Sequence, residues 1–238
     1  MDLNRYFSFQ ITMSKRTKEF FQHEDDPHGI AKKVMLYRYL QSRFSELLNH
    51  VQSSGKYRFT YFDAFSGPGK HDENEPGNSC IENIDIPYRD RTYGSPLVAM
   101  DALFSAMEKN GKSSCKVKLV FEDANPTYLE RLKENIKQYF ENEIEYPRKD
   151  KNGVQYFTEI FKTDNGDDKS LHYTVKNQKR NVPFDIQISF VHSEFSDFDV
   201  KEIMPDDFQV TPGITFIDPF GYKDIPCLLY TSPSPRDS

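Results

Sequence analysis

The chain has 238 residues and carries 31 Lys and Arg against 37 Asp and Glu, which gives a formal net charge of -6 at pH 7. This length suits one domain or slightly more, and the acidic balance argues against sequence-independent binding along phosphate backbones. The 20 Phe and 14 Tyr supply the apolar area that a packed core needs, which excludes an intrinsically disordered chain.

Membrane, secretory and metal-binding classes are not indicated. No apolar run reaches the roughly 18 residues of a membrane-spanning helix, and charged residues interrupt positions 1–21, unlike a signal peptide. The widely spaced Cys80, Cys115 and Cys227 form neither a CxxC pair nor an even disulfide framework. We therefore expect a cytoplasmic protein with no membrane partner and no structural metal site.

The first part of the chain predicts a helix, a strand and a loop. Apolar residues recur at spacings of three and four from Ile30 to Val51, which is typical of an amphipathic helix. The aromatic run 57–63 predicts a strand, and Gly67-Pro68-Gly69 after it predicts a tight turn. Residues 70–93 carry six acids and predict a loop long enough to be a lid.

Further helices and strands are predicted downstream. Gly94-Ser95-Pro96 predicts a helix start, because Ser is a favoured N-cap and Pro a favoured first helical residue. Asn125-Pro126 similarly opens a helix over 127–140. The polar stretch 141–183 predicts irregular structure with a hairpin around Gly153. Strands are predicted at 117–121, 186–191 and 213–217.

Strands that alternate with helices predict a parallel α/β sheet with crossover helices, in which ligands bind outside the carboxyl ends of the strands. Polar residues follow each predicted strand, and we expect them to gather on one edge of the sheet. These residues are Asp63–Gly69, Glu122–Asp123, His192–Glu194 and Asp218–Gly221.

The glycine turn after the first strand is compared with three nucleotide-binding patterns. The P-loop pattern is not met, because position 64 is Ala and position 71 is His. The nicotinamide pattern fits poorly, because Asp72 stands where a third glycine is needed. The remaining pattern is that of class I S-adenosylmethionine methyltransferases, in which an acid and a glycine loop after the first strand meet an acid at the end of the second.

In that pattern Glu122 accepts hydrogen bonds from both ribose hydroxyls, and Asp123 does so if the strand register differs by one. Asp63, Phe65, Gly67 and Gly69 are expected around the methionine and ribose parts of S-adenosylmethionine, and Glu194 near its adenine. A plain strand and turn, or a solvated strand end, would explain the same residues without a ligand.

Asp218-Pro219-Phe220-Gly221 resembles the Asp-Pro-Pro-Tyr box of amino-group methyltransferases. The resemblance implies that the Asp218 side chain and a backbone carbonyl of the box accept hydrogen bonds from the target NH₂ group, while Phe220 stacks on a planar base. Asp218, Pro219 and Phe220 are thus the expected catalytic residues. The second proline is missing, and a strand that ends in a proline turn is the alternative.

The chain as a whole resembles the three-Cys-motif partner protein family, whose members look like class I methyltransferases. The resemblance implies S-adenosylmethionine at the glycine loop and leaves the methyl acceptor open. It covers roughly residues 20–225 and depends on five segments: Lys33–Leu40, Phe62–Gly69, Gly94–Leu97, Phe121–Glu122 and Phe216–Tyr222.

This resemblance implies a Rossmann-like, doubly wound parallel sheet, in which about four core strands are found of the seven in a class I methyltransferase. We expect an N-terminal extension 1–29, a domain 30–225 with insertions 70–93 and 141–183, and a non-native or disordered tail 226–238. The chain is thus expected to be a C-terminally truncated fragment whose fourth strand forms an open edge.

Two functions from different classes stay open. The first is an S-adenosylmethionine-dependent methyltransferase-like protein that acts on an amino group of a nucleobase or another planar substrate. The alternative is a catalytically inactive methyltransferase-fold module that works through a protein or nucleic-acid partner. An NAD(P)-dependent oxidoreductase is a third hypothesis, which predicts binding of a nicotinamide dinucleotide.

Overall fold

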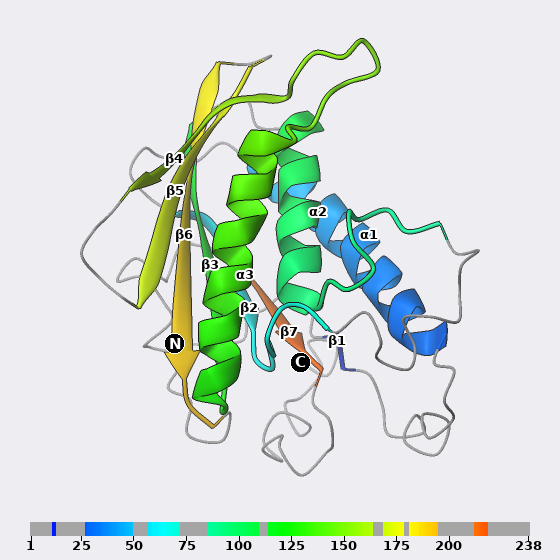
Figure 1. The fold of residues 1–238 in the computed structure, drawn as a ribbon, viewed down its shortest axis with the longest axis vertical. Helices are drawn as coiled ribbons and strands as arrows, with labels where there is room; N and C mark the ends of the chain where they lie inside the picture. Colours follow the sequence, from blue (N-terminus) through cyan, green and yellow to red (C-terminus); the bar gives the residue numbers. More distant parts are fainter. Residues whose placement is uncertain are drawn as a thin grey trace, which may run out of the picture.

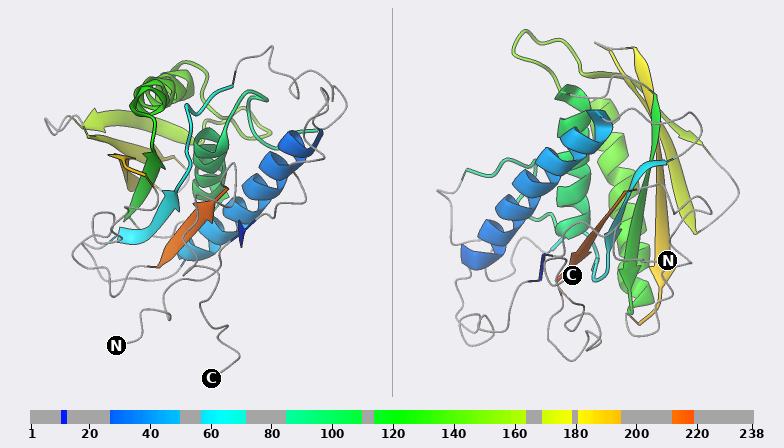
Figure 2. Two further views of the ribbon diagram at one scale, coloured as in Figure 1. Left: turned by 90° about the horizontal axis from the view of Figure 1, so that it is seen from below. Right: turned by 180° about the vertical axis from the view of Figure 1, so that it is seen from behind.

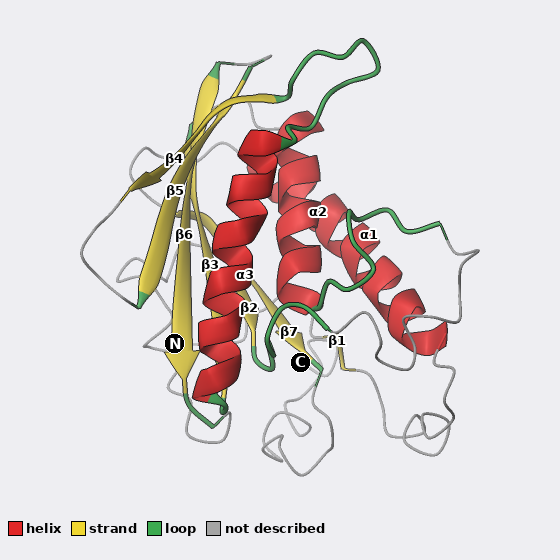
Figure 3. Cartoon of the chain, viewed as in Figure 1, coloured by secondary structure: helices red, strands yellow, loops and turns green. Residues whose placement is uncertain are grey.

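The computed structural model describes residues 11–12, 27–49, 57–71, 85–109, 114–163, 169–178, 181–194 and 212–218. They form an α/β unit in which helices pack against one mixed sheet (Figures 1 and 3). The helices are α1 (Pro27–Asn49), α2 (Ser95–Lys109) and α3 (Pro126–Glu145). The strands are β1 (Ile11–Thr12), β2 (Tyr57–Asp63), β3 (Cys115–Asp123), β4 (Phe157–Thr163), β5 (Ser170–Asn177), β6 (Val182–His192) and β7 (Gly213–Ile217).

The strand order is β1-β7-β2-β3-β6-β5-β4. Four adjacent strands of this sheet run parallel to one another, in the order β7, β2, β3 and β6. Among these four strands, β2 comes first along the chain, β3 pairs with β2, and β6 pairs with β3. The last strand, β7, pairs with the other side of β2. This is the 3-2-1-4 order of the first four strands in a Rossmann-like sheet, so the predicted fold class is compatible with the structure at this level.

The prediction of a wholly parallel sheet with an irregular segment 141–183 was wrong. Strands β4 and β5 extend the sheet beyond β6, and both junctions are antiparallel. The connections at 164–169 and 178–181 are too short for the crossover that a parallel pair requires. The turn at Gly153 is present, with φ of 79° and a bridge between Lys149 and Gln155.

The predicted open edge at the fourth strand was also wrong. Strand β1 pairs in parallel with β7, with Ile11 opposite Phe216 and Thr12 opposite Ile217. Part of the expected extension 1–29 therefore belongs to the sheet. Residues 219–238, which include the predicted tail, lie outside the described residues.

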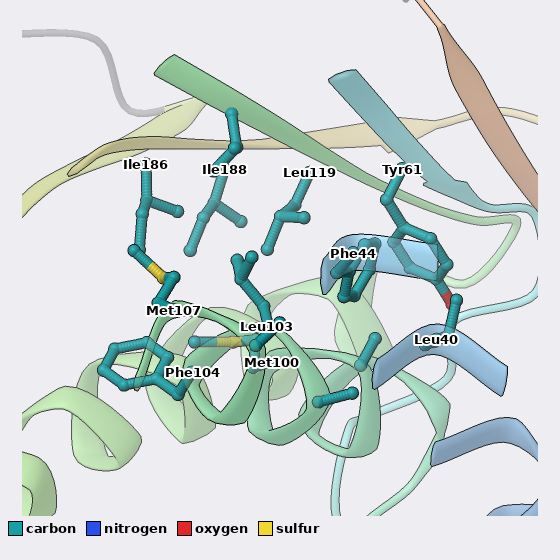
Figure 4. Packing of buried hydrophobic residues seen from close by; sticks show 14 of the residues in the cluster. Leu40, Phe44, Tyr61, Met100, Leu103, Phe104, Met107, Leu119, Ile186 and Ile188 are labelled. Atoms are coloured by element: carbon teal, nitrogen blue, oxygen red, sulfur yellow. The ribbon is translucent and has the colours of Figure 1, made fainter. Parts of the chain in front are cut away.

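The main core lies between the sheet and helices α1, α2 and α3, which cover the same face (Figure 2). Within the described residues, no helix covers the other face, where the expected doubly wound fold would have one. None of the described helices is long and apolar enough to cross a membrane. Figure 4 shows Leu40, Phe44, Met100, Leu103, Phe104 and Met107 of the helices against Tyr61, Leu119, Ile186 and Ile188 of the strands.

A buried charge network joins α2 and α3. The Arg148 guanidinium lies against Glu143 at 2.8 Å and Glu108 at 3.5 Å, and it also pairs with Asp101. The Tyr139 hydroxyl donates to Asp101 at 2.9 Å. Glu143 also pairs with Arg89 at 3.0 Å, so removing Arg148 would mainly take the compensating charge away from Asp101 and Glu108.

We expect Arg148→Met to lower the free energy of unfolding by about 3–5 kcal/mol, because it breaks a buried ion pair from one side. Arg43→Met removes the exposed pair of Arg43 with Glu46 and should cost under about 1 kcal/mol. Urea denaturation of both variants tests this difference. Equal losses would show that the Arg148 network contributes no more than a surface pair.

Candidate functional site

Four parallel strands bring their carboxyl ends to one edge of the sheet, which confirms the predicted gathering of polar residues for the part of the chain described. Asp63 ends β2, Asp123 ends β3, and Asp218 follows β7. Ser193 follows β6 and donates a hydrogen bond to Glu122 at 2.5 Å. The strand order reverses between β2 and β7, and such a switch point is where open α/β sheets bind ligands.

The glycine loop after β2 is fastened to the tip of β3. Gly67 and Gly69 have φ of 60° and 80°, a left-handed region that favours glycine. The Gly67 amide donates to Asp123 Oδ2 at 2.9 Å, and the Ser66 amide and hydroxyl both donate to the Glu122 carbonyl at 2.9 Å. The loop is therefore held in place before any ligand binds.

The insertion 70–93 leaves and re-enters the fold at this loop. The His71 amide donates to the Thr92 carbonyl at 2.9 Å, and the Gly94 amide donates to the Gly69 carbonyl at 2.7 Å. Helix α2 therefore starts beside the glycine loop, where its dipole favours negative charge. The predicted lid is not tested, because residues 72–84 lie outside the described residues, whereas Tyr93 at the return is buried.

Asp63 is fully buried at the tip of β2. Burial raises the pKa of its carboxyl to about 7, and the negative charge of Asp218 acts in the same direction. The nearby Ser95 side chain and the Phe65 amide lower the pKa but do not offset burial. No described group lies in hydrogen-bond geometry with Oδ2. This atom can therefore accept a hydrogen bond from a ligand.

Glu122 lies one residue before the strand tip and is also fully buried. Burial raises the pKa of its carboxyl to about 7, although the Ser193 hydroxyl favours the ionised form. The charge of the neighbouring Asp123 raises the pKa further. Among the described residues, Oε2 has no hydrogen-bond partner.

Asp123, rather than Glu122, occupies the tip of β3, because the strand continues two residues beyond the predicted end at 121. Asp123 is half-buried, and its carboxylate accepts the Gly67 amide at 2.9 Å and the Asn125 amide at 2.8 Å. A carboxylate has about four lone-pair positions, so both oxygens retain capacity for ligand hydroxyls.

The other predicted site residues are more dispersed. Phe65 packs against a small apolar cluster that includes Phe62 and Ile217. Glu194, expected near an adenine, is exposed. Pro219 and Phe220 lie outside the described residues, so the predicted stacking ring remains a prediction.

Lys32 is a site residue that the sequence did not predict. Its ammonium group lies 3.4 Å from Asp218 Oδ1, across 186 positions of sequence. Lys32 belongs to an ordinary amphipathic helix pattern, so no local signal distinguishes it from a solvated surface lysine.

Within the described residues, no group of three or more His, Cys, Asp or Glu side chains could hold a metal ion. Comparison with models of protein families, with curated proteins and with solved structures gave no match for this chain. The expectation drawn from the family resemblance therefore stays a prediction.

The two loop glycines should respond differently to alanine. A Cβ atom at Gly69 would lie 2.5 Å from Leu132 Cδ1 in the core, whereas a Cβ at Gly67 would meet no atom within 4 Å. We expect Gly67→Ala to lower the free energy of unfolding by about 1–2 kcal/mol through backbone strain. Gly69→Ala should lower the free energy of unfolding by about 1–3 kcal/mol more than backbone strain alone, because the added methyl group overpacks the core at Leu132. Thermal and urea unfolding measure both, and equal losses would contradict the packing of Gly69 on α3.

Glu122 should make stability depend on pH. The folded protein retains the Glu122 proton up to about pH 7, whereas the unfolded chain loses it near the ordinary Glu value, about 4.3. The folded state thus binds more protons between these values, and its stability falls as the pH rises through that window.

We expect Glu122→Gln to reduce the loss of stability between pH 5 and pH 8 by about 2 kcal/mol, since the variant cannot ionise. Urea denaturation at both pH values measures this loss. The exposed Glu130→Gln variant serves as the control and should keep the wild-type dependence. The same pH dependence in Glu122→Gln and wild type would contradict the raised pKa.

Proposed function

We propose that the edge formed by the ends of β2, β3 and β7 binds S-adenosylmethionine, and that the protein is a methyltransferase-like protein. The observation that carries the proposal is the glycine loop, which is fastened by Gly67 to Asp123 beside the switch point of a 3-2-1-4 sheet. A nucleoside cofactor needs close backbone approach and an acid at the next strand tip, and this edge provides both.

The described residues fit such a cofactor. The space beside Gly67 is open, since a Cβ there would meet nothing within 4 Å. Asp123 at the strand tip is the favoured acceptor for the two ribose hydroxyls, and Glu122 is the second candidate. The unpartnered oxygens of Asp63 and Glu122 support the presence of ligand donors at this edge.

S-adenosylmethionine supplies an electrophilic methyl group when bound. The chain then has to orient the acceptor nitrogen, and Asp218 is the residue proposed to do so by accepting a hydrogen bond from its N–H. Methyl transfer to nitrogen depends on in-line approach more than on a strong base, so Asp218 acts by orientation. An amino group of a nucleobase or another planar substrate is the proposed acceptor.

A binding module without chemistry is the second candidate. The observation that favours it is the ion pair of Asp218 with Lys32, because the carboxylate proposed to orient the acceptor is already engaged. Such a module would bind S-adenosylmethionine and act through a protein or nucleic-acid partner. Cofactor binding without methyl transfer to any offered amine, nucleic acid or protein would favour this candidate.

Calorimetric titration of S-adenosylmethionine and S-adenosylhomocysteine tests the cofactor site. We expect the wild type to bind both, and Asp123→Asn to weaken binding at least tenfold through loss of the charged acceptor. Asp150→Asn is the matched control, because Asp150 also accepts two backbone amides, at 2.8 and 3.0 Å, but in the turn at Gly153. It should leave affinity unchanged.

A larger loss in Glu122→Gln than in Asp123→Asn would assign the ribose to Glu122 instead. Failure of the wild type to bind either compound would overturn the proposed function. Competition of a nicotinamide dinucleotide with S-adenosylhomocysteine would favour the oxidoreductase hypothesis.

A further inference from the structure

The ion pair between Lys32 and Asp218 lies at the switch point of the sheet. Lys32 Nζ is 3.4 Å from Oδ1 and 3.5 Å from Oδ2 of Asp218. The two side chains keep 28% and 31% of their surface exposed, so a ligand can reach both charges. The pair joins the start of α1 to the end of β7. Strand β7 lies next to β2, the strand that leads into the glycine loop.

Asp63 lies on the same face of the sheet as Asp218. Asp63 is opposite Phe216 in the β2–β7 register, and Phe216 belongs to the core under the helices. Side chains two positions apart on a strand share a face, so Asp218 follows Phe216 on that side. The buried Asp63 carboxyl therefore lies near the Lys32–Asp218 pair, and the charge of Asp218 raises its pKa. Its Oδ2 atom has no hydrogen-bond partner among the described residues, so it can accept one from a ligand.

The described strand ends at this edge carry mainly acids, and Lys70 after the glycine loop lies over the Tyr93 ring. The described acids at the strand ends are Asp63, Glu122, Asp123, Glu194 and Asp218. Lys32 supplies a positive charge among them, whereas the adjacent Lys33 reaches the Arg91 carbonyl at 2.7 Å instead. A ligand group with one negative and one positive charge matches this arrangement better than a simple anion or cation.

An α-amino acid group has this charge pattern. Its nitrogen lies about 2.5 Å from its carboxyl carbon, given standard bond lengths and angles. Placed head to tail against the Lys32–Asp218 pair, its ammonium group meets Asp218 and its carboxylate meets Lys32. Both contacts are charge-assisted hydrogen bonds, which are stronger than neutral ones.

We propose that the Lys32–Asp218 pair binds the α-ammonium and α-carboxylate groups of the cofactor, so the site selects a nucleoside that carries an amino acid. One Asp218 oxygen is thereby assigned to the cofactor's ammonium group, and the other keeps acceptor capacity for the N–H of the methyl acceptor. This inference depends on the proposed function and adds a ligand-binding role for Lys32. Asp63 Oδ2 takes a second hydrogen bond from the same ammonium group. The pair is then a ligand clamp as well as a contact between α1 and β7.

Two probes separate this clamp from the rest of the site. S-adenosylhomocysteine carries the amino-acid part, and 5′-methylthioadenosine is the same nucleoside without it. Calorimetric titration of both into the wild type, Lys32→Gln and Lys137→Gln gives the comparison. Lys137 is a matched control, since it also pairs with a carboxylate, Glu134 at 2.5 Å, on the exposed side of α3.

We expect Lys32→Gln to weaken S-adenosylhomocysteine about tenfold or more and to leave 5′-methylthioadenosine within about twofold, because only the first compound reaches Lys32. Lys137→Gln should change neither, and Lys32→Arg should restore most of the affinity. Equal weakening of both compounds, or no weakening of either, would overturn the clamp while the cofactor site stands. A wild type that binds neither compound would overturn the proposed function and the clamp together.

Discussion

The hydrogen bond between the Gly67 amide and the Asp123 carboxylate joins the two central strand tips of the sheet. It fixes the glycine loop over the end of β3, and the Gly94 amide then brings the start of α2 to the same loop. The two ends of the insertion 70–93 are held together by the hydrogen bonds of His71 with Thr92 and of Gly94 with Gly69. The helix start therefore stays beside the loop. The geometry of the proposed site therefore depends on this fastening more than on any single ligand-facing side chain.

The buried acids around this loop are costly to the fold. Asp63 and Glu122 are fully buried, each with one oxygen that no described group satisfies, and burial raises the pKa of both to about 7. Such groups reduce stability unless a ligand pairs with them. Their position at the switch point is consistent with a site that gains hydrogen bonds when it is occupied. The Arg148 network, by contrast, has a cation among its acids and holds α2 against α3.

The sequence was sufficient to predict the helices and the four parallel strands, because their apolar periodicity and their turn residues agree. It was not sufficient for β4, which exposes most of its residues and has little apolar pattern. The acids at the strand tips were predicted, and their roles stay predictions. The observed length of β3 puts Asp123, the alternative to Glu122, at the strand tip. Lys32 could not be found, because its contact with Asp218 depends on packing between distant segments.

The most direct test of the central claim is amide hydrogen exchange with and without S-adenosylhomocysteine. If the fastened glycine loop is the cofactor site, the compound should slow exchange in peptides covering residues 63–71 and 120–125. Peptides from β4 and β5, on the far side of the sheet, should not change. Protection that is absent from the glycine loop, or that appears only at β4 and β5, would contradict the account.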